Sequence, residues 1–250
     1  MKKRSFIRVK FFFMVMVMVA FFIPIHLSAQ EAKYPWEKHK NDKDKGTDIT
    51  YYMAVKPGIY SPQKSGFKSF DIGSGIYSLQ TSDIKSFDTG FNGEIAFGCR
   101  PNPNFAAEMG VGYFHTGVKG PLLPYDVKVK ADINVMPITF TFNGILPYKQ
   151  WEFFALGGIG GYWVFGDLKA SGTVDGLSGT VNLNDSTMIF GGHLGLGFHY
   201  NITPTVFVGA EGKYLWTSKA KLQDEVYGVP VEAKFKMDGI LATAVIGFRF

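Results

Sequence analysis

The feature that most limits the possible folds is an alternation of side-chain character with a period of two residues. Between positions 87 and 100, one alternate series is mainly apolar, and it consists of Phe87, Thr89, Phe91, Gly93, Ile95, Phe97 and Cys99. The residues between them are polar or very small, and positions 187–200 repeat the pattern. Because successive side chains of a β-strand point to opposite faces, each segment is predicted to be a strand with one apolar face.

Eight such segments can be placed along the chain, at positions 50–60, 87–99, 105–117, 130–145, 151–165, 187–200, 206–217 and 236–250. Each is at least as long as the roughly 9–11 residues that a tilted strand needs to cross a hydrocarbon layer. The connections alternate in length, with short ones at 101–104, 146–150 and 201–205 and long ones at 61–86, 118–129, 166–186 and 218–235. This is the pattern of transmembrane barrels, whose short turns face the periplasm. We therefore predict an all-β fold over 49–250, an eight-stranded antiparallel transmembrane β-barrel with an up-and-down meander.

The order of aromatic residues along the segments helps to separate this fold from a soluble alternative, a lipocalin-like barrel or a β-sandwich. Aromatic residues lie at both ends of the apolar face, among them Trp151, Phe153 and Tyr200 near the short turns and Trp163, Tyr214 and Trp216 near the long loops. Smaller aliphatic residues lie between them. Two aromatic girdles around an aliphatic band are typical of a lipid-facing surface, whereas a soluble core has no reason to sort rings by depth.

The N-terminal segment is predicted to be an export signal. Five basic residues within positions 1–10 precede an apolar run of 15 residues at 11–25, and Ser28 and Ala29 follow as small residues. A membrane anchor is the alternative, but the run is shorter than the roughly 20 residues of a spanning helix. We therefore predict a signal peptide over 1–29 and a flexible, charged periplasmic lead-in over 30–48.

The charge of the chain gives no support for a nucleic-acid partner. The sequence has 26 Lys and Arg against 21 Asp and Glu. The predicted signal contains five of the basic residues and no acidic one, so 26 less five leaves 21 basic against 21 acidic residues in the predicted mature chain. The net positive charge of the full sequence therefore comes from the predicted export signal. The single cysteine, Cys99, excludes an internal disulfide.

The opposite, polar face of the segments is predicted to line the barrel interior. It carries charged residues that form an expected interior network, namely Lys56, Glu94, Glu108, Glu152, His193, Glu211, Lys213 and Arg249. These side chains could form a polar pathway, since lumen residues tune conduction. They could instead pair and plug the barrel, because buried charges require partners. Eight strands leave an interior just wide enough for side chains to fill, so we favour the plug.

Other candidate sites have weaker support. The glycine-rich runs at 157–161 and 192–197 lie within predicted strands, whereas nucleotide-binding loops join a strand to a helix. The oxygen-bearing residues Asp175, Asn182, Asn184 and Asp185 lack the spacing of a calcium-binding loop. We predict no cofactor, no metal and no catalytic residue.

Three segments combine simple alternating strands, short turns and glycine-rich strands, and they are VMPITFTFNGILP (135–147), FFALGGIGGYWVF (153–165) and HLGLGFHYNITPTVFVGAEGKYLW (193–216). In these segments the chain resembles the small eight-stranded outer-membrane β-barrel superfamily, the OmpA/OmpX-like or porin-family proteins. The last strand resembles the C-terminal assembly signal of such proteins, with alternate residues Ala242, Ala244, Ile246, Phe248 and Phe250. The resemblance implies a place in the outer membrane of a Gram-negative bacterium and recognition by the barrel-assembly machinery. Its motifs are architectural and specify no activity.

Some barrels that resemble this one act on lipid A, so a lipid A-modifying enzyme is one alternative. A nucleophile, a base and an acid would be needed, and Ser186 or Thr187 with His193 and Asp185 are the available side chains. In the deacylases of that kind the triad lies on the membrane-facing side, whereas the alternation places His193 inside. His199 lies on the same face as His193.

We therefore predict a non-enzymatic outer-membrane barrel, structural or adhesive, with a charge-plugged lumen. A narrow porin-like channel for ions or small solutes is the first alternative, and the enzyme is the second. The expected partners are outer-membrane lipid and lipopolysaccharide, the assembly machinery and an extracellular partner of the loops. The loop residues expected to make contacts are Phe67, Phe70, Tyr77, Leu122, Leu123, Tyr125 and Tyr227.

Overall fold

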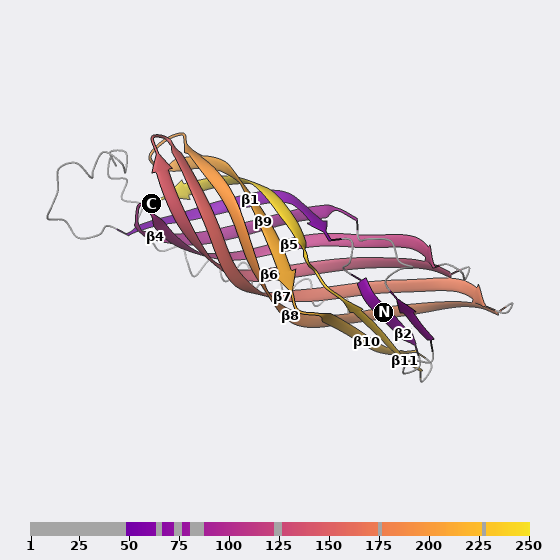
Figure 1. Cartoon of the computed structure of the whole chain (residues 1–250). Helices are drawn as coiled ribbons and strands as arrows, with labels where there is room; N and C mark the ends of the chain where they lie inside the picture. Colours follow the sequence, from indigo (N-terminus) through magenta and orange to yellow (C-terminus); the bar gives the residue numbers. More distant parts are fainter. Residues whose placement is uncertain are drawn as a thin grey trace, which may run out of the picture. The chain divides into compact units, whose positions relative to one another are not determined.

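The computed structural model describes residues 49–63, 67–72, 77–80, 88–122, 127–174, 177–226 and 229–250. The predicted signal peptide (1–29) and lead-in (30–48) lie outside these residues. Eight strands form a closed barrel (Figure 1), and they are β1 (Thr50–Pro62), β4 (Gly90–Asn102), β5 (Phe105–Leu122), β6 (Val127–Tyr148), β7 (Trp151–Val174), β8 (Leu177–Asn201), β9 (Val206–Thr217) and β12 (Gly239–Arg249). No helix among the described residues is long and apolar enough to cross a membrane.

The barrel strands follow one another in an up-and-down order. Each pairs antiparallel with the next barrel strand along the chain, and β1 pairs with β12 to close the ring. This confirms the predicted fold class. The end that carries the turns at 103–104, 149–150 and 202–205 is called here the turn end, and the opposite end is the loop end. In transmembrane barrels the short turns face the periplasm.

The predicted long loops were partly wrong. Strands β5 and β6 continue together to Leu122 and Val127, and β7 and β8 pair as far as Val174 and Leu177, where loops had been expected. Beyond the hydrocarbon layer a strand needs no apolar face, so the alternation that marks lipid-facing strands fades there. Backbone pairing continues without it, because ladder hydrogen bonds do not depend on side-chain polarity.

The other two predicted loops also contain strands. A separate four-stranded sheet has the order β10 (Ala220–Val226), β11 (Val229–Phe235), β2 (Phe67–Ile72) and β3 (Tyr77–Gln80). It is tied to the long barrel hairpin, because the backbone N–H of Gln223 donates to Asp185 Oδ2 at 2.9 Å and Leu222 packs against Gly166. Of the predicted loop-contact residues, Phe67, Phe70 and Tyr77 lie in this sheet, whereas Leu123, Tyr125 and Tyr227 lie outside the described residues.

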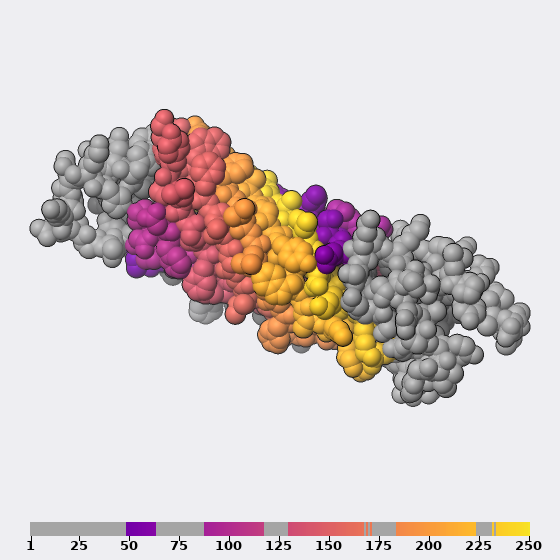
Figure 2. Space-filling model, viewed as in Figure 1, coloured from indigo at the N-terminus to yellow at the C-terminus, as the bar shows by residue number. Residues whose placement is uncertain are grey.

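Side chains alternate between the barrel interior and its outer surface. In β12 the burial pattern is strictly alternating, with Leu241 and Val245 inside and Ile246 and Phe248 exposed. The outer surface carries large apolar side chains on every barrel strand. Figure 2 shows the side chains of the barrel strands as a closely packed surface on the face that it presents. An apolar outer face around a closed ring of strands suits hydrocarbon, in which every backbone group must be paired internally.

Candidate functional site in the barrel interior

Five charged side chains meet in the middle of the barrel, and we call them the central cluster. They are Lys56 on β1, Glu94 on β4, Glu108 on β5, and Glu211 and Lys213 on β9. All five belong to the interior network that the sequence predicts. The strand alternation directs each of them inward, and the register places Lys56 directly opposite Glu94.

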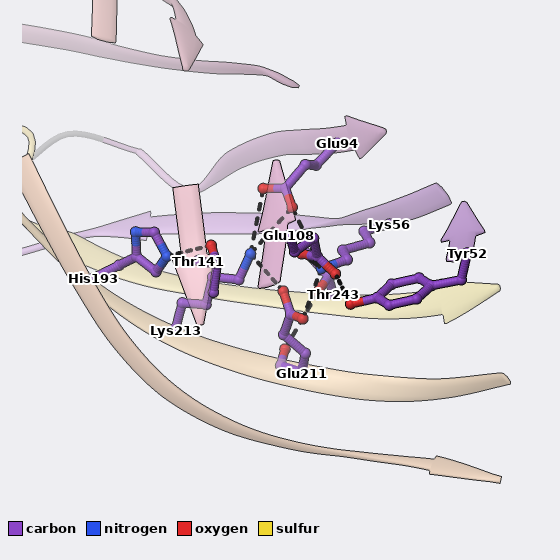
Figure 3. A network of polar contacts seen from close by, with 9 residues as sticks. All are labelled: Tyr52, Lys56, Glu94, Glu108, Thr141, His193, Glu211, Lys213 and Thr243. Carbon is purple, nitrogen blue, oxygen red and sulfur yellow. Dashed lines mark hydrogen bonds and ion pairs between the residues drawn. The ribbon is translucent and has the colours of Figure 1, made fainter. Parts of the chain in front are cut away.

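The contacts within the central cluster are continuous (Figure 3). The Nζ of Lys56 lies 2.5 Å from Glu108 Oε1, 3.0 Å from Glu211 Oε2 and 3.5 Å from Glu94 Oε1. The Nζ of Lys213 lies 2.6 Å from Glu211 Oε1 and 3.2 Å from Glu94 Oε1. Each lysine therefore bridges carboxylates from at least two strands, and the cluster spans the lumen.

The central cluster is almost inaccessible to solvent. The exposed fraction of its side chains ranges from 2% for Glu211 to 10% for Glu94. A buried charge is costly unless it is paired and hydrogen-bonded, and here every ammonium group has carboxylate partners. A cross-linked cluster of this kind fills the interior and fixes the positions of the strands that carry it.

A second group of charges lies toward the turn end, and we call Arg100, Glu152 and Arg249 the turn-end cluster. Arg100 Nη1 donates to Glu152 Oε1 and Arg249 Nη2 donates to Glu152 Oε2, each at 2.8 Å. Glu152 and Arg249 were among the predicted residues, but Arg100 was not. The alternation could have found it, because Arg100 lies on the same face of β4 as Glu94.

Tyr52 connects the two clusters and was also missed. Its hydroxyl donates to Glu108 Oε2 at 3.1 Å, and its backbone is paired in register with that of Arg249 on β12. Gly98 lies beside the Tyr52 ring so closely that any Cβ at this position would overlap it. Interior glycines thus make room for interior rings, and a glycine opposite a tyrosine on the next strand is the signal that sequence reasoning could have used.

His193 lies at the other side of the central cluster, toward the loop end. Its Nε2 is 2.8 Å from Thr141 Oγ1, and the side chain is buried. A Cβ on Gly158 would lie 2.7 Å from this Nε2 atom, so glycine is required there. The residue sits inside the barrel, as the sequence predicts, and its partner is a hydroxyl rather than a carboxylate.

The candidate enzyme residues are not brought together. Asp185 accepts hydrogen bonds from the backbone N–H groups of Ser186 and Gln223, so it fixes local backbone. His193 lies eight residues farther along β8, which at about 3.3 Å per residue corresponds to roughly 26 Å. No cluster of three or more potential metal ligands occurs within the described part of the chain. Of the four oxygen-bearing residues weighed as calcium ligands, Asp175 lies outside the described residues.

Apolar side chains close the interior at the loop end. Tyr60, Phe114 and Met237 are each at most 1% exposed, and the rings of Tyr60 and Phe114 lie 4.5 Å apart. The Tyr60 hydroxyl donates to the carbonyl of Met237 at 2.9 Å, and Thr217 Oγ1 accepts from the Met237 N–H. This layer, here called the apolar cap, was not predicted.

The outward-facing candidates lie on the barrel surface. In the girdle near the turn end, Trp151 is 39% exposed and Phe153 47%, and Tyr200 donates from its hydroxyl to Gln150. At the other girdle the exposed residues are Trp163, Tyr214 and Trp216. The last-strand residues that resemble a C-terminal assembly signal all face outward, and they are Ala242, Ala244, Ile246, Phe248 and Phe250. Their role in assembly remains a prediction.

No protein-family model matches this sequence, and no curated protein matches it either. Solved structures do match. The outer membrane protein OprG from Pseudomonas aeruginosa superposes with a TM-score of 0.58 and 16% identity, covering 82% of this chain and 97% of that one. Ail, the attachment invasion locus protein of Yersinia pestis, has a TM-score of 0.40 and 13% identity, and the match covers 81% of this chain and 99% of Ail. The outer membrane protease OmpT from Escherichia coli has a TM-score of 0.42 and 11% identity, and the match covers 81% of this chain and 96% of OmpT. The likeness to OprG shows the fold.

Proposed function

We propose that this chain, which has the fold of the small eight-stranded outer-membrane β-barrels, is a non-enzymatic barrel with a closed lumen whose loop end makes the functional contacts. The observation that carries the proposal is the central cluster. Lys56 contacts carboxylates from three other strands, and Lys213 links two of these carboxylates a second time. A solute would have to break these contacts in order to pass.

The outer surface supports insertion in the outer membrane. Its middle is aliphatic, with Ile95 50% exposed and Leu194 60% exposed, and the aromatic girdles lie above and below. Aromatic rings favour the level of lipid headgroups. The partners we propose are outer-membrane lipid and lipopolysaccharide around the girdles, with the barrel-assembly machinery as a transient partner of the last strand.

The described part of the loop end consists mainly of paired β-strands. The hairpin of β7 and β8 extends to Val174 and Leu177, and the four-stranded sheet is attached to it through Asp185 and Leu222. Ordered backbone binds with less loss of conformational entropy than a flexible loop does. We infer that this end holds a partner, such as another cell surface or lipopolysaccharide, in an adhesive or structural role.

Planar-bilayer recording tests the closed lumen. Purified, folded protein should give no discrete conductance steps, and the same should hold for Lys130→Gln, which removes an exposed charge. Discrete steps whose size or ion selectivity changes in Glu94→Gln or Lys213→Gln would overturn the plug. Heat-modifiable migration on a detergent gel would verify that each variant is folded.

A shortened hairpin tests the role of the loop end. Joining Gly117 to Asp132, which are paired in register, through a two-residue Asn-Gly turn removes the tip of the β5–β6 hairpin. The change also removes the part of β6 that pairs with Leu168–Gly172 of β7, and it leaves the ladder between that level and the turn end unchanged. We expect cells with the full chain to adhere to lipopolysaccharide-coated surfaces or to one another, and cells with the shortened chain to lose at least part of this adhesion. Equal adhesion of cells with the full chain and cells without the protein would contradict the proposal.

A narrow conduit is the second candidate function. The observation in its favour is that polar groups occur at successive levels of the lumen, from Arg249 through Tyr52 and Glu108 to Lys213. The apolar cap argues against it, because ions do not cross a dry apolar layer without a large desolvation cost. Recording separates these two candidates as described above.

An enzymatic role has the least support. Among the described residues, the histidine nearest to a hydroxyl nucleophile is His193, and it is enclosed in the barrel with Thr141. The mass profile of lipid A should be unchanged when the protein is overexpressed. A new lipid A species that disappears in His193→Gln would restore the enzyme hypothesis.

A further inference from the structure

A small cavity lies inside the barrel at the turn end, beside the turn-end cluster. Its lining includes Tyr52, Arg100, Glu152, His199, Phe207 and Arg249. It has room for about one water molecule or an ion of similar size. Neither the closed lumen nor the loop-end contacts require such a cavity.

The charges around the cavity do not balance. Two guanidinium groups, Arg100 and Arg249, face one carboxylate, Glu152, and both oxygens of that carboxylate are already used by the two arginines. Both arginines are 8% exposed. One buried positive charge is therefore left over, and a buried charge without a counter-charge is strongly unfavourable.

The surplus is not neutralised within the turn-end cluster. The central cluster has three carboxylates and two ammonium groups, so the lumen as a whole is balanced. However, the carboxylate of Glu108 already has partners for both of its oxygen atoms. Its Oε1 contacts the Nζ of Lys56, and its Oε2 accepts a hydrogen bond from the hydroxyl of Tyr52, a residue that lines the cavity. The positive and negative surpluses are thus held apart on the two sides of the Tyr52 side chain.

Two buried nitrogen atoms near the surplus charge have no hydrogen-bond partner in the described structure. His199 Nε2 is one of them, and its ring is held between Phe154 at 4.6 Å and Phe207 at 4.5 Å. Asn201 Nδ2 is the other, in a side chain that is 1% exposed and whose Oδ1 accepts from Arg249 Nη1 at 2.6 Å. Buried polar atoms are rarely left without a partner.

We propose that this cavity binds one small inorganic anion of about the size of chloride. The guanidinium groups of Arg100 and Arg249 supply the charge, and His199, which also lines the cavity, supplies an imidazole N–H donor in its Nε2-protonated tautomer. The anion joins residues of β4, β7, β8 and β12, so it stabilises the closure of the barrel at its periplasmic end. A longer organic anion does not fit a cavity of this size.

Bromide is the direct probe, because its anomalous scattering locates it in a crystal of the full folded protein. We expect an anomalous peak in the cavity beside Arg249 and His199 for crystals grown in sodium bromide. The thermal midpoint of the heat-modifiability transition should also be higher in bromide or chloride than in gluconate at equal ionic strength, by about 2–4 °C. A peak absent from the cavity together with equal midpoints would show that it holds water only, and would overturn the proposal.

Variants separate site binding from general salt effects. His199→Phe keeps the ring between Phe154 and Phe207 but removes both nitrogens, and Arg249→Met removes the surplus charge. Both should lose the bromide-dependent shift. Lys149→Met removes a positive charge from the turn between β6 and β7 without touching the cavity, and it should keep the full shift. An equal bromide shift in His199→Phe would contradict the assigned site, and the anomalous map of the unaltered protein decides the question if a variant fails to fold.

Discussion

The Nζ atom of Lys56 lies 3.0 Å from Oε2 of Glu211, although 155 residues separate the two in the sequence. Their strands are not neighbours, because β12 lies between β1 and β9 in the ring. On the other side Lys56 reaches Glu108 of β5 past the intervening β4. One ammonium group thus links strands on both sides of the β1–β12 seam that closes the barrel.

Removing this ammonium group should therefore destabilise the whole barrel. Lys56→Met leaves three buried carboxylates with Lys213 as their remaining cation in the central cluster, and breaking one partner out of a buried ion network costs about 3–5 kcal/mol. The free energy of unfolding by urea in phospholipid vesicles would measure the loss. Lys130→Met is the matched control, since its side chain is 51% exposed in an ion pair with Asp132 and the change should stay within about 0.5 kcal/mol. Equal effects of the two substitutions would show that the cluster does not stabilise the fold.

Interior glycines should be sensitive to a single methyl group where a ring lies against them. Gly98→Ala places a Cβ in the space of the Tyr52 ring, and overpacking of this kind costs about 1–3 kcal/mol. Gly212→Ala, in β9, meets no atom within 4 Å and should be neutral or slightly stabilising. The free energies of unfolding of the two variants in phospholipid vesicles test this difference. A neutral Gly98→Ala would mean that Tyr52 does not occupy the position described.

Most of the barrel and the central cluster follow from the two-residue alternation. Because neighbouring side chains of a strand point to opposite faces, a strand that turns Ile95 outward must turn Glu94 inward. A closed ring of eight strands then brings the inward-facing charges within reach of one another. The sequence does not state which charges pair. That Lys56 lies against Glu108 and Glu211 as well as Glu94 depends on barrel diameter and strand stagger, which no local pattern encodes.

Two parts of the interior were not predicted for a different reason. Tyr60 and Phe114 are large rings on the face expected to be polar, and they pack there because interior glycines leave volume that must be filled. The four-stranded sheet at the loop end forms outside the lipid layer, where strands no longer show one apolar face. Its pairing joins β2 to β11 across more than 150 residues of chain, and short segments of sequence cannot reveal a contact of that range.

A charge on the outer surface should report the position of the bilayer. Leu194→Arg introduces a guanidinium in the aliphatic band, at a side chain that is 60% exposed to the surroundings, and the expected cost is about 2–4 kcal/mol near the bilayer midplane. Ile202→Arg lies in the turn between β8 and β9, is exposed to a similar degree at 53%, and should cost about 0–1 kcal/mol. Unfolding free energies in vesicles test the difference. If both substitutions were equally mild, the outer face would not be lipid-facing.

The terminal aromatic residue should matter more for assembly than for the stability of the finished barrel. Phe250 follows β12, the strand that closes the ring against β1, and it continues the outward series of Ile246 and Phe248. If the assembly machinery reads this series from its end, deletion of Phe250 should sharply lower the amount of heat-modifiable protein in the outer membrane of expressing cells. The same truncated chain should still fold into detergent or vesicles after purification, because the Phe250 side chain faces outward and is 50% exposed. Phe105→Ala removes another exposed ring near the turn end and should insert normally. Normal insertion of the truncated chain would contradict a role of Phe250 in recognition, whereas failure of both chains would indicate that the turn-end girdle as a whole is needed.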